Sequence, residues 1–108
     1  MDINNAVKTL ESLAHETRLG VFRLLVQAGP AGLSAGDIAE RLGALQNTMS
    51  SHLQKLDRAG LIKSRREGRH IIYSADFESL SGLIIFLMDD CCGGSVEVCE
   101  PIAASIKC

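Results

Sequence analysis

Apolar residues recur at helical spacing over several stretches of the chain and crowd into two short stretches between turn residues. The spacing predicts helices over residues 3–13, 17–27, 34–42, 46–59 and 77–90. Two strands are expected at 61–66 and 70–74, because a turn containing Gly68 separates two runs of strand-forming residues. The helix at 17–27 is apolar around much of its circumference, so we expect it at the centre of the core.

The stretch from Gln46 to Gly60 carries the clearest chemical pattern. Met49, Leu53, Leu56 and Ala59 fall on one helix face. The other face carries short amides and hydroxyls with a cation near the start of the helix: Gln46, Asn47, Thr48, Ser50, Ser51, His52 and Lys55. Such side chains read DNA base edges and bind phosphates, so this face is a candidate DNA-reading surface. The alternative is a surface helix that lacks charge.

The neighbours of this helix complete a known arrangement. The helix at 34–42 stops at Gly43 and is joined to the polar helix by a turn of a few residues, as in a helix-turn-helix. The hairpin that follows would be the wing of a winged helix. Its Arg65, Arg66 and Arg69 are expected beside a DNA backbone or in a minor groove. The alternative is a solvated sheet edge that charge protects from pairing. The predicted fold class is mainly α with a β-hairpin, a winged helix-turn-helix.

Composition fits one small DNA-binding unit. A chain of 108 residues with 46% hydrophobic residues is long enough for one folded domain. We assign residues 1–92 to a DNA-binding and dimerisation domain and residues 93–108 to a cysteine-containing tail. The formal net charge is -2, but residues 55–70 hold six Lys or Arg against two acidic residues. Basic charge is therefore concentrated where DNA contact is expected.

The helix at 77–90 is more apolar than one small domain needs. Paired with the first helix, it is expected to form a two-fold homodimer interface. Such a dimer would set two recognition helices about one DNA turn apart and read an inverted-repeat operator. The alternative is that both helices close the monomer core.

The four cysteines have no expected role as disulfides. The polar, acidic start of the chain is no secretory signal, and the longest apolar run, 83–88, is too short to span a bilayer. No membrane association is therefore expected, and a cytoplasmic chain keeps its thiols reduced. Cys91, Cys92 and Cys99 fall within nine residues, with Gly93 and Gly94 allowing the chain to reverse, so three thiolates can converge.

Three thiolates favour a soft trivalent centre. Structural zinc takes four ligands, so here it would need Cys108 or water as the fourth. As(III) takes three sulfurs and its formal charge is balanced by three thiolates; Sb(III) and methyl arsenite are chemically close. A redox switch in which Cys99 resolves an oxidised partner stays open, as does a disordered tail with incidental cysteines. A thiol enzyme is not expected, because no Cys-x-x-Cys motif or nearby base accompanies the cysteines.

The sequence resembles the ArsR family of metal- and metalloid-responsive repressors over residues from about 6 to 92. The resemblance rests on four segments: Leu13-Ala14-His15-Glu16-Thr17-Arg18-Leu19, Leu33-Ser34-Ala35-Gly36-Asp37-Ile38-Ala39, Ser50-Ser51-His52-Leu53-Gln54-Lys55-Leu56, and Ala59-Gly60-Leu61-Ile62 with the Arg66-Glu67-Gly68-Arg69 turn. It implies a homodimeric winged-helix repressor that binds its operator without inducer and releases it on binding.

Two inducer sites of the family are absent. Residues 33–37 lack the Cys-x-Cys pair of the long-known arsenite site, and residues 77–90 lack the His of the zinc site on the last helix. What remains is similar to a C-terminal arsenite-site variant with Cys91, Cys92 and Cys99. Cys99 can come from the same or the other subunit, and Cys108 is expected to be free or a minor ligand.

Overall fold

The computed structural model describes residues 1–43, 46–89 and 96–106, and of residues 46–47, 96–99 and 103 it describes the backbone. In chain order the elements are α1 (Ile3–Leu13), α2 (Glu16–Ala28), the 3-10 helix η1 (Gly29–Ala31), β1 (Leu33–Ser34), α3 (Ala35–Leu42), α4 (Gln46–Arg58), β2 (Ile62–Glu67), β3 (His70–Ala75), α5 (Phe77–Met88) and α6 (Val96–Ser105). The five predicted helices and both predicted strands are confirmed, whereas η1, β1 and α6 were not expected.

Side-chain caps set where the helices begin. Asp2 and Asp76 accept hydrogen bonds from the backbone N–H groups of Asn5 and Ser79, at the starts of α1 and α5. Ser34 does the same for the N–H of Asp37 at the start of α3, at 3.2 Å. These groups satisfy N–H donors that have no partner inside the helix. The caps therefore follow directly from the sequence.

The core lies where α2, α3 and α4 meet the base of the hairpin. From α2 it takes Val21, Phe22 and Leu25, and from α3 Ile38 and Ala39. The helix α4 and the hairpin base complete it with Met49, Leu53, Leu56, Leu61, Ile62 and Ala75. The expected central position of the second helix is confirmed.

The sheet is antiparallel, with strand order β1-β3-β2. Leu33 of β1 lies opposite Tyr73 of β3, so a two-residue strand ties the start of α3 to the hairpin. Gly32, just before β1, has φ 71 and ψ -172, a region open essentially to glycine alone. A Cβ at Gly32 would lie 2.4 Å from the carbonyl oxygen of Tyr73, so this contact requires glycine.

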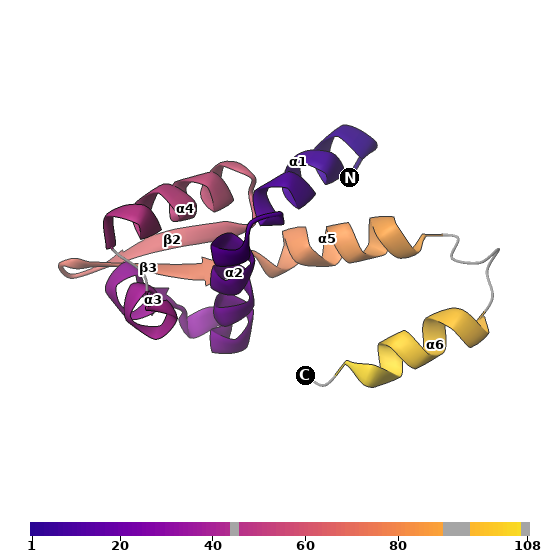
Figure 1. Ribbon diagram of the computed structural model, residues 1–108. Helices are drawn as coiled ribbons and strands as arrows, with labels where there is room; N and C mark the ends of the chain where they lie inside the picture. Colours follow the sequence, from indigo (N-terminus) through magenta and orange to yellow (C-terminus); the bar gives the residue numbers. More distant parts are fainter. Residues whose placement is uncertain (44–45, 90–95, 107–108) are drawn as a thin grey trace.

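The hairpin and the dimerisation candidates lie at opposite ends of the molecule. Figure 1 shows β2 and β3 extending to one side beside α4, whereas α1 and α5 extend to the other. All residues of β2 except Ile62 are exposed, as expected for a projecting wing. None of the helices in the described ranges is long and apolar enough to cross a bilayer.

Candidate nucleic-acid interface

One face of α4, the candidate recognition helix, packs into the core, and the other face is exposed to solvent. Met49, Leu53 and Leu56 are almost completely buried in the core. Thr48, Ser50, Ser51 and Lys55 are exposed, as the sequence pattern predicts. Gln46 and Asn47 lie in its first turn, where the structure describes their backbone. The helix therefore presents hydroxyls and a cation from a rigid support.

His52 does not lie on this open face, so its expected outward position is wrong. Its side chain is 9% exposed, and its ring centroid lies 4.7 Å from that of His15. His15 in turn caps α2, where its Nδ1 accepts a hydrogen bond from the N–H of Thr17 at 3.1 Å. Helical spacing explains the placement, because His52 lies three residues after Met49 and four before Leu56, both buried. His52 positions α4 against α2.

Arg18 links His52 to the first helix. Its Nε donates to the carbonyl oxygen of Ser12 at 2.6 Å, and its Nη1 lies 3.4 Å from Nδ1 of His52. Arginine can only donate, so this contact is a hydrogen bond when Nδ1 of His52 carries no proton and accepts. Burial lowers the pKa of His52 below its usual 6.5, and the charges of His15, Arg18 and Lys55 lower it further. A neutral His52 therefore favours the contact between Arg18 of α2 and α4, whereas the hydrogen bond of Arg18 to Ser12 does not involve His52.

The three wing arginines differ in their surroundings. The guanidinium of Arg65 donates to the carbonyl oxygens of Pro30 and Ala31, at 3.1 and 2.7 Å, and pairs with Glu67 at 3.1 Å. It thereby fastens the wing to η1, a role that no pattern in the sequence indicates. Its DNA contact stays a prediction.

Arg66 and Arg69 form fewer hydrogen bonds and ion pairs with the described residues than Arg65 does. Arg66 is exposed and donates through Nε to the carbonyl oxygen of Gly68 at 3.4 Å, within the turn. Arg69 is exposed at the end of the turn. It lines a cleft of about 590 Å³ together with Ser50 of α4 and Asp37 of α3. The cleft brings the recognition helix and the wing together on one surface.

The predicted thiol site falls largely outside the described residues. Cys91, Cys92 and Cys108 lie beyond them, and Cys99 belongs to α6 with its backbone described. Among the described side chains, no group of three His, Cys, Asp or Glu could hold a metal ion. The Cys91, Cys92 and Cys99 site therefore stays a prediction.

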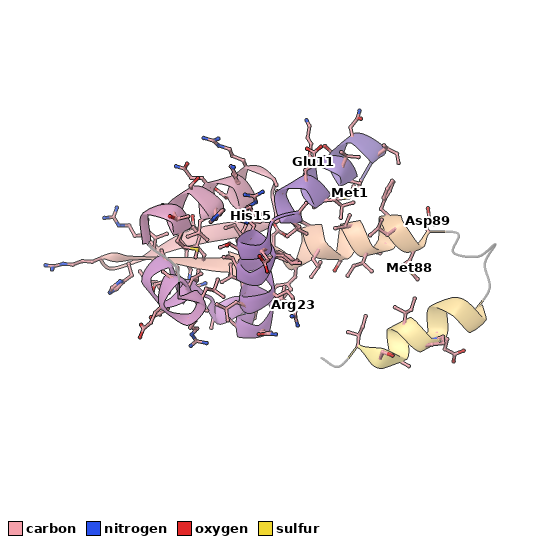
Figure 2. The ribbon with its side chains drawn as sticks, in the orientation of Figure 1. Met1, Glu11, His15, Arg23, Met88 and Asp89 are labelled. Atoms are coloured by element: carbon pink, nitrogen blue, oxygen red, sulfur yellow. The ribbon has the colours of Figure 1, made fainter. Side chains whose placement is uncertain are left out.

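Both helices expected at a dimer interface carry uncovered apolar residues. On α1 these include Ile3, Val7 and Leu10, and on α5 Ile84, Ile85 and Leu87. Of the α5 residues, only Leu83 is buried. Figure 2 shows Met88 at the end of α5 with Asp89 after it, and Cys91 and Cys92 follow in the sequence.

Comparison with known proteins places this architecture in a family. Residues 13–65 match the family model described as a helix-turn-helix domain. The chain is 31% identical over 87 residues to the HTH-type transcriptional regulator YgaV of Escherichia coli K12, covering 81% of this chain and 86% of YgaV. A solved homodimeric winged helix-turn-helix domain from Mycobacterium bovis, a possible ArsR-family regulator, is 30% identical with a TM-score of 0.64, covering 82% of each chain. The chain belongs to the ArsR family of winged helix-turn-helix transcriptional regulators.

Two further similar proteins carry names that mention resistance to a metal or a metalloid. A possible transcriptional regulator for arsenical resistance is 26% identical with a TM-score of 0.64, covering 93% of this chain and 98% of that one. A cadmium resistance regulatory protein CadC homolog of Staphylococcus aureus is 30% identical over 80 residues, covering 74% of this chain and 64% of that protein. The family consists of transcription regulators and not of enzymes, and it includes regulators named for metal or metalloid resistance.

Proposed function

We propose that this ArsR-family protein is a homodimeric repressor that binds an inverted-repeat operator and releases it when As(III) binds Cys91, Cys92 and Cys99. The observation that carries the DNA-binding part is the exposed polar face of α4 beside an exposed basic wing. The thiol part rests on the density of cysteines after α5.

DNA contact is divided between the helix and the wing. Thr48, Ser50 and Ser51, with Gln46 and Asn47 in the first turn, face base edges in the major groove. Lys55, Arg66 and Arg69 neutralise phosphates, and basic contacts of this kind supply much of the affinity. Arg65 contributes mainly by holding the wing on η1.

The homodimer follows from the uncovered apolar faces of α1 and α5. The similarity to a homodimeric winged helix-turn-helix domain supports this assembly. A two-fold dimer presents two copies of α4 to two half-sites, which a monomer cannot do.

As(III) is the inducer that the thiol chemistry favours, since three thiolates match a soft trivalent centre. The arsenical-resistance neighbour is consistent with this choice. Sb(III) and methyl arsenite share the chemistry. Release needs a coupling free energy of about 1–3 kcal/mol, or about 5- to 150-fold in operator affinity, which is typical of allosteric proteins.

A second candidate inducer is Zn(II) or Cd(II) at the same thiols. The cadmium-resistance relative favours it, and Cys108 or water would then supply a fourth ligand. Such a site would leave the winged-helix function unchanged and alter only the signal.

The test compares two cysteine variants by operator binding in reducing buffer. Cys92→Ser should bind the operator like the wild type and no longer release it with arsenite. Cys108→Ser is the matched control and should keep the arsenite response. Loss of DNA binding by Cys92→Ser without arsenite, or an unchanged arsenite response, would contradict the assignment of Cys92.

A further inference from the structure

A basic cleft lies between α1 and the C-terminal half of α4, outside both the wing and the first turns of the recognition helix. It consists of two adjoining cavities of about 350 and 330 Å³ that share Lys8, Arg58 and Ala59 in their walls. Lys55 and Arg18 line the second cavity, and Glu11 is the acidic residue in its wall. Four basic side chains thus surround one cleft against one carboxylate.

The exposed cations of this cleft have no ion-pair partner among the described residues. Lys8, Lys55 and Arg58 are exposed, and none forms an ion pair with a described residue. Lys55 and Arg58 also lie in the last turn of α4, where basic residues favour the helix dipole. That role does not account for Lys8, which lies in the middle of α1.

The cleft continues the proposed DNA-reading face of α4. Thr48, Ser51, Lys55 and Arg58 are spaced by three, four and three residues, which places them in one row along the helix. The row is about 15 Å long at 1.5 Å per residue. A DNA major groove is about 12 Å wide, which is less than the length of this row. When Thr48 and Ser51 face base edges, the far end of the row therefore reaches the sugar–phosphate backbone that borders the groove.

We propose that this cleft binds a backbone phosphate of the operator, with Lys8 of α1 and Arg58 of α4 as its two principal ligands. The proposal rests on the proposed DNA-binding function and adds α1 to the DNA-contacting elements. Because α1 also carries the dimer face, the site lies on the side of α4 that faces the second subunit, toward the centre of the operator. A phosphate there would tie the dimerisation helix and the recognition helix to the same DNA strand.

The experiment measures operator affinity against salt concentration for Lys8→Gln and Arg58→Gln. Each variant removes one of the two cations that hold this phosphate in each subunit, so the slope of log K against log salt should fall, by at most about 1.8 per dimer. Affinity should fall about tenfold or more near 0.1 M salt, equally on operator and unrelated DNA, because phosphate contacts carry no sequence information. Glu11→Gln should strengthen binding.

Arg23→Gln is the matched control, since Arg23 is an exposed arginine that Figure 2 shows further along α2 from His15. It should leave the slope unchanged. Sedimentation velocity checks that the variants stay dimeric. If Lys8→Gln does not stay dimeric, the salt slope of Arg58→Gln, a substitution on α4, decides whether the site binds a phosphate. A wild-type slope in Arg58→Gln overturns the site while leaving the repressor function intact.

A free anion as the occupant is tested separately. Inorganic phosphate is titrated into the protein without DNA at constant ionic strength and followed by calorimetry. No binding is expected at millimolar phosphate. Binding that Lys8→Gln abolishes, with an unchanged DNA salt slope, would overturn the proposal. A wild-type protein that binds no DNA at all would overturn both the repressor function and this site.

Discussion

Ile85 on α5 allows the dimer interface to be tested quantitatively. Its side chain is 67% exposed in the single chain, the largest exposure among the large apolar residues of the described ranges. Complete burial of an isoleucine contributes about 1.5–3 kcal/mol, so covering the exposed two-thirds contributes about 1–2 kcal/mol. A two-fold interface contains two copies, which gives about 2–4 kcal/mol per dimer.

Ile85→Ala should therefore weaken dimerisation by about 30- to 700-fold. The dimer dissociation constant is measured by sedimentation equilibrium on reduced protein without DNA. Ile71→Ala is the control, because Ile71 is 50% exposed on the wing and lies away from α5. A dissociation constant for Ile85→Ala within about threefold of that for Ile71→Ala would refute the assignment of α5 to the interface.

Three further predictions concern the parts that hold α4 and the wing. Gly32→Ala should lower the free energy of unfolding in urea by about 2–4 kcal/mol, because Gly32 has backbone dihedrals open only to glycine and the added Cβ would clash with Tyr73. Gly82→Ala in α5 is the control: its added Cβ meets no atom within 4 Å, so this variant should not be destabilised. The contribution of His52 to the free energy of unfolding should fall as the pH drops below 6.5 and level off below the pKa of His52 in the folded chain. The reason is that in this pH range the unfolded chain binds a proton at His52 that the folded chain excludes. His52→Gln should flatten this dependence of the free energy of unfolding on pH. Arg65→Ala should speed amide exchange in the wing about fivefold through loss of about 1 kcal/mol at η1, and exchange rates equal to wild type would contradict the clamp.

Local patterns in the sequence predicted the helices α1 to α5 and the wing. Ser34 as a cap, Gly43 as a stop and Gly68 in the turn each act within a few residues, so single-sequence reasoning can find them. The apolar face of α4 was also predicted. His52 was misplaced because its polarity was weighed above its helical position, although its spacing from Met49 already indicated the inner face.

Contacts between distant residues could not be predicted in this way. Arg65 binds carbonyl groups of Pro30 and Ala31, 35 and 34 residues earlier in the chain, and no local pattern signals such a pairing. The strand β1 has two residues, too few to show alternation, and its existence depends on pairing with β3. The basic cleft likewise forms only when α1 and α4 are brought together, since Lys8 and Arg58 are remote in sequence.

The most direct test of the arsenite-responsive repressor is fluorescence anisotropy of a labelled inverted-repeat operator with the reduced dimer. Arsenite, zinc and peroxide are titrated in parallel. Release at about stoichiometric arsenite, with zinc and peroxide inert, is the result that the three-thiolate site predicts. Release by zinc or peroxide with arsenite inert would contradict the arsenite site and assign the cysteines to another signal.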